Sequence, residues 1–213
     1  MGTLLVSEIF ERTGRILLDE GGVRWGSAEL LDWYNEGLLD MVTRRPGLLP
    51  SVDDVVLVAG TQQVLTTDRL AIIDVGQNIG SVAKPRNGQV PNITPKDTMD
   101  RLIPDWQYQS SSVMVITVVT HQQTPRIFWV YPPQPTVNPG RLRMIQSKRP
   151  TVVSATSAAF EPDDQYMPIM IEYLLYRAFS KDAENPSSGQ RSAQHLQNYL
   201  GLLGAGAPQP QQG

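Results

Sequence analysis

The stretch from Asp19 to Pro46, DEGGVRWGSAELLDWYNEGLLDMVTRRP, has the pattern of a helix end, a tight turn, a second helix and a stop. Gly21 and Gly22 favour the turn, because glycine reaches the left-handed conformation of a helix terminus without steric cost. Ser27 is the expected N-cap of the second helix, and Pro46 stops it. One face of this helix is apolar, formed by Leu30, Tyr34, Leu38, Met41 and Val42. The stretch therefore predicts a helix hairpin.

The helical period also occurs before this stretch and near the C-terminus. Residues 3–19 place one stripe of side chains toward a core: Leu5, Ile9, Thr13, Ile16 and Leu17, with Phe10 beside it. A third helix is expected from about Asp164 and a fourth from Ser187 to Gly204. The third helix is apolar on most sides, so it is covered on most sides. It lies either at the centre of the bundle or against another subunit.

Between the helix pairs the sequence changes to short β-branched runs, which predict six strands. The expected strands are residues 55–58, 63–66, 70–75, 113–120, 126–131 and 141–147. We expect the first two to form a hairpin, and 113–120 to form an antiparallel hairpin with 126–131. Pro132, Pro133 and Pro135 end the fifth strand, because proline lacks the donor of a sheet ladder. The long loop near 80–98 contains a helix start at Thr94 and Pro95.

The order of these elements predicts an α+β fold. The N-terminal and C-terminal helix pairs form a four-helix bundle, and an antiparallel β domain of about six strands is inserted between them. The expected bundle domain covers residues 1–48 and 161–204, and the β domain covers residues 49–160. Residues 205–213, AGAPQPQQG, have nothing to bury and are expected to be a disordered tail.

Composition and charge exclude several classes of function. The 213 residues contain no cysteine, so disulfides and thiolate metal sites are excluded. The net charge of −3 argues against a general nucleic-acid binder. The sequence lacks an apolar run long enough to span a membrane and lacks a signal peptide pattern, which predicts a soluble protein without a membrane partner.

Residues suited to catalysis are few. His121 and His195 are expected to be ordinary surface or hydrogen-bonded residues, because no local motif supplies partners for a base or a metal ligand. The acidic pairs 19–20, 53–54 and 163–164 lie next to predicted element ends, where carboxylates act as caps. We therefore expect no enzyme activity, no catalytic residue, no metal and no cofactor.

Four basic residues lie in and after the last predicted strand: Arg141, Arg143, Lys148 and Arg149. Arg141 and Arg143 alternate along the strand, so both point to one face. That face is either solvated or a contact for an anion or nucleic acid, and the sequence leaves both alternatives open.

Three segments resemble the head-to-tail adaptor (connector) proteins of short-tailed, double-stranded DNA bacteriophages, also called tail tubular protein A. They are ILLDEGGVRWGSAELLDWYNEGLLDMV, FWVYPPQP and EYLLYRAFSKDAENP, in this order along the chain. The resemblance implies a virion protein, assembled in the host cytoplasm into a homo-oligomeric ring, commonly of twelve copies. Such a ring connects the portal to the tail nozzle and forms part of the channel through which DNA passes without sequence-specific binding.

The resemblance also suggests roles for particular side chains. In the adaptor proteins of that family, the helices face the portal and neighbouring copies. Six residues of the predicted helices are therefore candidates for the helical core or for an oligomer or portal interface: Trp25, Leu30, Tyr34, Tyr173, Tyr176 and Phe179. The β region faces the nozzle, so the four basic residues become possible nozzle or DNA-channel contacts. Trp25 is expected to pack across the turn and hold the first hairpin against the third helix.

Two alternatives remain at this level. The first is a tail nozzle or head-completion protein of the same particle. The second is a small enzyme or ligand-binding module that uses the β domain and its long loop. A thermal-shift screen with glycans and metals separates this second class from a structural protein.

Overall fold

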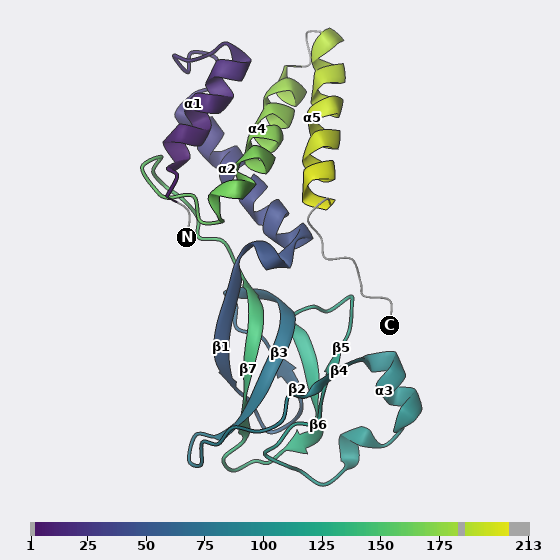
Figure 1. Ribbon diagram of the computed structural model, residues 1–213. Coiled ribbons are helices and arrows are strands. Elements are labelled where there is room, and N and C mark those ends of the chain that lie inside the picture. Colours follow the sequence, from purple (N-terminus) through teal and green to yellow (C-terminus); the bar gives the residue numbers. More distant parts are fainter. Residues whose placement is uncertain (1–2, 183–185, 205–213) are drawn as a thin grey trace. The chain divides into compact units, whose positions relative to one another are not determined.

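The computed structural model describes residues 3–182 and 186–204 (Figure 1). The chain divides into two compact units, one made of Met1–Leu49 with Pro150–Gly213 and the other of Pro50–Arg149. The described residues form five α-helices and two sheets of three and four strands, so the predicted α+β class is confirmed. The predicted disordered tail, residues 205–213, lies outside the described residues.

The helical unit contains the helices α1 (Val6–Leu17), α2 (Ser27–Arg44), α4 (Met167–Lys181) and α5 (Pro186–Gly204). Two short 3-10 helices, η1 (Pro46–Leu48) and η3 (Asp164–Tyr166), accompany them. Helix α4 contacts α1, α2 and α5, which explains why its sequence is apolar around most of the cylinder. None of the described helices is long and apolar enough to cross a lipid bilayer.

Two details of α1 and α2 differ from the prediction. The buried face of α1 consists of Val6, Ile9, Phe10, Thr13 and Gly14, whereas Leu5 and Ile16 are exposed. The N–H groups of Val6 and Ser7 donate to the carbonyls of Ala158 and Thr156, which sets the rotation of the helix. The N-cap of α2 is Gly26 without a side-chain bond, so the predicted Ser27 cap is wrong.

The β unit contains seven strands in two sheets. Strands β1 (Pro50–Val56), β7 (Gly140–Lys148) and β3 (Arg69–Ser81) form an antiparallel sheet in the order β1-β7-β3. The second sheet has the order β2-β6-β5-β4, with β2 (Gly60–Val64), β6 (Ile127–Gln134), β5 (Thr117–Thr120) and β4 (Asn92–Pro95). Side chains of both sheets share one hydrophobic core, which includes Val75, Val118, Phe128, Leu142 and Met144.

The predicted hairpin of residues 55–58 and 63–66 is wrong. Strand β1 pairs with β7, and β2 pairs with β6, so the turn between them carries the chain from one sheet to the other. Leu57 donates its N–H to the carbonyl of Gly140 at 3.0 Å and is buried. Gln63 then binds both the N–H and the carbonyl of Val58, at 2.7 and 2.8 Å, which closes the crossover.

The β5–β6 hairpin is antiparallel as predicted, but the region around it differs. The long loop near 80–98 contains β4, which pairs parallel with β5, so the β unit is not wholly antiparallel. Helix α3 (Lys96–Leu102) follows Pro95, where the sequence indicated a helix start. Strand β6 continues through Pro132 and Pro133 to Gln134. A proline keeps its carbonyl acceptor, and that of Pro133 receives the N–H of Ser112.

Helix α3 and the 3-10 helix η2 (Trp106–Tyr108) cover one face of the second sheet. Met99 and Trp106 form a small core with Val119, and Trp129 and Tyr131 pack against it. The indole N–H of Trp106 donates to Asp100 at 2.9 Å. These aromatic side chains therefore pack inside the β unit.

Candidate interaction surface

One carboxylate holds the turn between α1 and α2. Asp19 accepts the backbone N–H groups of Val23, Arg24 and Trp25 at 2.9, 3.1 and 2.8 Å. Gly22 takes the left-handed conformation, with φ of 60°, that brings these N–H groups back to Asp19. The N–H of Trp25 is the largest cause that lowers the pKa of Asp19, because it stabilises the ionised form.

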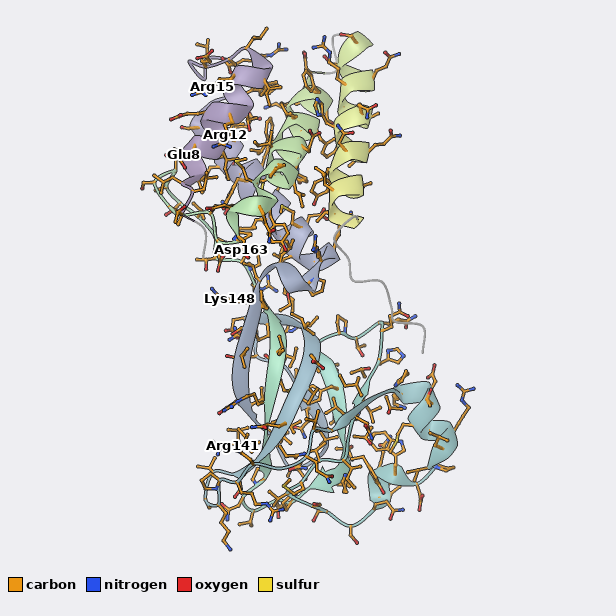
Figure 2. All side chains as sticks on the ribbon, viewed as in Figure 1. Glu8, Arg12, Arg15, Arg141, Lys148 and Asp163 are labelled. Carbon is orange, nitrogen blue, oxygen red and sulfur yellow. The ribbon has the colours of Figure 1, made fainter. Side chains whose placement is uncertain are left out.

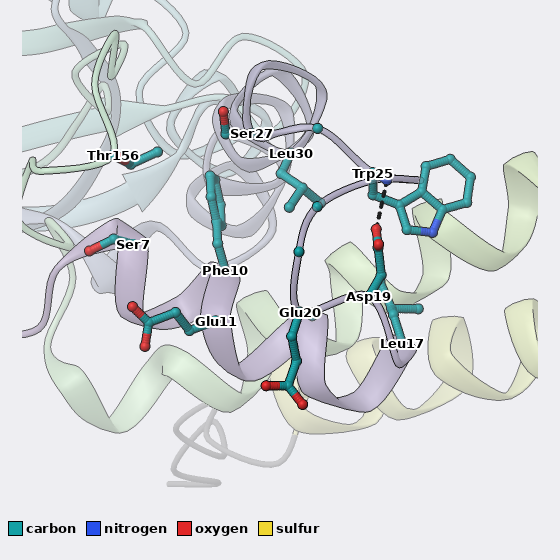
Figure 3. A pocket seen from close by; sticks show the side chains of 14 residues that line it. Ser7, Phe10, Glu11, Leu17, Asp19, Glu20, Trp25, Ser27, Leu30 and Thr156 are labelled. Atoms are coloured by element: carbon teal, nitrogen blue, oxygen red, sulfur yellow. Dashed lines mark hydrogen bonds between the residues drawn. The ribbon is translucent and has the colours of Figure 1, made fainter.

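A cavity of about 440 Å³ lies beside this turn, between α1 and α2 (Figure 3). Phe10, Trp25 and Leu30 supply its apolar lining, and Glu11 and Glu20 supply carboxylates. Figure 3 shows Asp19 turned toward the backbone of Trp25. An apolar lining with acidic neighbours suits an apolar or basic side chain of a partner.

Asp19 gives the turn a defined dependence on pH. Its lowered pKa means that its stabilising contribution is present above the unfolded value of 3.8 and is lost as the pH falls through the lower folded pKa. We expect Asp19→Asn to lower the melting temperature at pH 7. We also expect the melting temperature of this variant to fall less than that of the unmodified chain when the pH is lowered below 3.8. Melting curves of both proteins across this range measure it, and equal acid sensitivity would contradict the assignment.

Aromatic and cationic side chains connect α2 to α4. The rings of Trp25 and Trp33 lie 5.4 Å apart, and Lys181 of α4 lies over both, at 5.7 and 6.0 Å from their centroids. Arg177 lies over Trp33 at 5.7 Å. The same two cations pair with Glu29 and Glu36 of α2. Trp25 therefore lies between the turn, α2 and α4.

The six predicted interface residues all lie in the helical unit. Trp25, Leu30, Tyr34 and Tyr173 are buried within one chain, whereas Tyr176 and Phe179 are partly exposed. The ring of Tyr173 meets those of Tyr176 and Tyr199 edge-on, and Phe179 stacks on His195. The buried residues are core residues of the single chain, and the interface role of the set stays a prediction.

Helix α5 is fastened to its neighbours by polar side chains. The hydroxyl of Tyr199 donates to Asp40 of α2 at 2.6 Å, and Arg44 donates to the same carboxylate at 2.7 Å. Burial, and then the bond to Asp40, raise the pKa of Tyr199. His195 lies 2.8 Å from Glu172 of α4, so it is a hydrogen-bonded residue as predicted.

Sequence reasoning missed Gly37 of α2, which packs against the ring of Tyr173 in α4. A Cβ at this position would lie 2.5 Å from Cδ1 of Tyr173. The available signal was a glycine inside the apolar face of a helix, between Tyr34 and Leu38. Such a glycine has a packing reason when the helix is otherwise regular.

The four basic residues of the β unit do not form one cluster. Arg141 and Arg143 lie on the face of β7 opposite Leu142 and Met144. Lys148 ends the strand, roughly 23 Å from Arg141 at 3.3 Å per residue, and Figure 2 shows the two at opposite ends of β7. The backbone N–H of Arg149 donates to the backbone carbonyl of Asp68 at 2.8 Å.

Arg143 pairs with a carboxylate that the sequence assigned to a cap. Asp54 accepts two bonds from Arg143, at 2.8 and 3.1 Å, and Asp53 accepts one from Arg69 at 2.9 Å. Both aspartates lie inside β1, so the capping prediction for 53–54 is wrong. Cross-strand ion pairs occupy these carboxylates instead.

The other titratable groups are dispersed. Within residues 3–182 and 186–204, no group of three or more His, Asp or Glu side chains could hold a metal ion. His121 lies in the turn between β5 and β6, where its carbonyl accepts the N–H of Thr124.

The sequence was compared with protein families and with curated proteins. Residues 5–212 match the family model of the SU10 adaptor protein. No curated protein matches the sequence. The matched range includes α1, the whole β unit and α5, so it covers both compact units.

Proposed function

Because the chain belongs to the SU10 adaptor protein family, we propose that this phage structural adaptor forms a ring between the portal and the tail nozzle. The match over residues 5–212 carries this proposal, because it covers both units. We further propose that the protein resembles the tail tubular protein A of short-tailed phages. That resemblance implies about twelve copies, and a closed ring of identical copies has cyclic symmetry. It is a virion component, and the ring would assemble in the host cytoplasm.

The two units would have different roles in this ring. We propose that α1, α2, α4 and α5 form a four-helix bundle that faces the portal and neighbouring copies, while the β unit faces the nozzle. The charges support this division. Residues 50–149 contain 10 Lys and Arg against 7 Asp and Glu, and the remaining residues contain 8 against 14.

The excess of positive charge would favour the β unit for contact with the DNA backbone, because phosphate binding depends on Lys and Arg. Arg141, Arg143, Lys148 and Arg149 are the proposed contacts with the nozzle or the DNA in the channel. Such contacts would be independent of DNA sequence. The acidic helical unit would repel passing DNA and let it slide.

The experiment is co-production of the chain with the portal protein of the same phage, followed by cryo-electron microscopy. We expect an additional ring of density on one end of the portal. A portal without extra density would contradict the proposal. A monomeric state of the isolated chain would be compatible with it, because an adaptor can assemble on its portal.

A small fusion shows which unit faces away from the portal. We expect a compact tag inserted in the exposed turn 136–138 of the β unit to appear on the side distal to the portal. Tag density against the portal would support the nozzle or head-completion role instead.

A further inference from the structure

Strand β1 lies at the margin of its sheet, beside β7 (Figure 1). Bonded positions alternate along an antiparallel pair of strands. The N–H of Leu57, the residue after β1, donates to the carbonyl of Gly140 at 3.0 Å, which fixes this alternation. The residues that direct their backbone N–H and C=O groups away from β7 are therefore Val52, Asp54 and Val56. Within the part of the chain that the structure describes, these outward groups have no hydrogen-bond partner.

The free edge of β1 lacks the usual protection against pairing with another strand. Folded proteins protect such edges with a bulge, a lysine or a proline inside the strand. The register of β1 with β7 is continuous, β1 contains no lysine, and its one proline, Pro50, begins the strand. Val52 and Val56 are 64% and 54% exposed, and the charge of Asp54 is paired with Arg143. The edge is therefore open to a further strand.

A cavity of about 470 Å³ lies beside this edge and is lined by residues of β1 and β2. Val55 and Leu65 give it apolar lining. Asp53 and Asp68 share one cation, Arg69, at 2.9 and 2.5 Å, so one of these two carboxylates is uncompensated. A strand paired with β1 would place every second side chain on this side of the sheet. Apolar and basic side chains would fit the cavity there.

The edges of β3 and β4 do not match the edge of β1. The register of β3 with β7 shifts repeatedly, as expected for a bulged strand. The outer edge of β3 is also partly occupied, because the N–H groups of Asn78 and Ser81 donate to the carbonyls of Gln89 and Lys84. Strand β4 has four residues and ends at Pro95, which has no N–H. Neither strand offers a regular row of free donors and acceptors to the β1 of another copy.

The proposed ring also argues against a second copy at this edge. A contact between two β1 strands would use the same edge on both copies, and such a contact closes after two copies. Strand β2 lines the same cavity as β1, so pairing of β1 with the β2 of another copy would close in the same way. A ring requires two different surfaces on each copy. The edge of β1 is therefore left for a different protein.

We propose that β1 pairs, along residues 52–56, with an extended segment of the nozzle protein. The inference rests on the proposed function, in which the β unit faces the nozzle. The segment has about five residues, with apolar β-branched side chains at alternate positions. It places a Lys or Arg beside Asp53 and Asp68. Backbone bonds hold the two proteins together, and the side chains that enter the cavity select the segment.

Hydrogen exchange tests this pairing without any substitution. Amide exchange of β1 is followed by mass spectrometry in portal-bound rings, before and after addition of the nozzle protein of the same phage. We expect the N–H groups of Val52, Asp54 and Val56 to exchange roughly tenfold slower or more after the addition, because a ladder bond protects an amide. The N–H groups of Ser51 and Val55 face β7, so they should change little and serve as the internal control.

Two substitutions at one position separate backbone pairing from side-chain contact. Val52→Pro removes an outward N–H but no bond to β7, and proline is tolerated at such an edge. Val52→Ala keeps this N–H and shortens the side chain. We expect severalfold weaker nozzle binding for Val52→Pro, and binding close to that of the unmodified chain for Val52→Ala. Thermal melting and ring formation on the portal, which should be similar for the two variants, check the folding.

The contrary results are distinct from one another. Nozzle binding with unchanged exchange at β1 would overturn the strand pairing and leave the adaptor role intact. Slow exchange of the outward amides before the nozzle protein is added would show that another copy or the portal covers the edge, and would also overturn the pairing. Equal loss of nozzle binding in both variants would assign the contact to the side chain of Val52 and overturn the backbone pairing. Rings that do not bind the nozzle protein would overturn both this inference and the proposed function.

Discussion

Replacing Gly37 with leucine is expected to lower the free energy of unfolding of the helical unit by about 3 kcal/mol, the upper part of the range for overpacked cores. A Cβ at Gly37 would lie 2.5 Å from Cδ1 and 2.8 Å from Cε1 of Tyr173. Tyr173 cannot move away, because its ring lies 5.3 Å from that of Tyr199 and 5.9 Å from that of Tyr176. Urea unfolding followed by circular dichroism measures the change.

Gly201→Leu is the matched control for this substitution. Gly201 also lies inside a helix, α5, but nothing lies within 4 Å of a Cβ built there. Leucine is a better helix former than glycine, so we expect this variant to be neutral or more stable by up to about 1 kcal/mol. Equal destabilisation of the two variants would show that α2 and α4 do not approach closely at Gly37.

The helices could be predicted because their signals are local. The apolar face of α2 follows from the spacing of Leu30, Tyr34 and Leu38, and all three are buried. The helix ends at Arg44, just before Pro46. The rotation of α1 could not be predicted in the same way, because bonds from Val6 and Ser7 to residues about 150 positions later determine it.

Strand pairing could not be predicted from the sequence, because it depends on contacts between residues that are distant along the chain. Residues 55–58 and 63–66 are close in sequence, which favours a hairpin, yet β1 pairs with β7 and β2 pairs with β6. The signal for the crossover is Gln63, a buried polar side chain that binds both backbone groups of Val58. The sequence alone does not indicate that a glutamine in a predicted strand will bind the backbone of a preceding residue.

The candidate surface was predictable only in part. An apolar third helix implied extensive burial, and Tyr173 and Leu174 are indeed buried in α4. The exposure of Leu18 and Val23 could not be predicted, because it follows from the three backbone bonds of Asp19 that turn the chain. From the sequence, Asp19 fits a helix cap equally well.

Replacing Trp25 with alanine is expected to lower the free energy of unfolding of the helical unit by about 3 kcal/mol, as for other buried aromatic residues. Trp25 is only 8% exposed, and the substitution removes its contact with Trp33 and the cation–π contact with Lys181. Because Trp25 supports the turn between α1 and α2, the substitution should weaken the assembly of copies and also lower the melting temperature. Thermal melting of the free chain and mass measurement of portal-bound rings follow the two effects.

Two variants show whether the effect of Trp25 arises from packing inside the chain. Val23→Ala, two residues away and exposed, should leave the melting temperature unchanged. Trp25→Phe should recover much of the lost stability, because an aromatic ring can still meet Trp33 and Lys181. If Trp25→Ala leaves the melting temperature unchanged but abolishes assembly, then Trp25 contacts a partner and its packing against α4 contributes little. If stability and assembly fall together and Trp25→Phe restores both, the indole supports the turn, and the turn presents the contact surface.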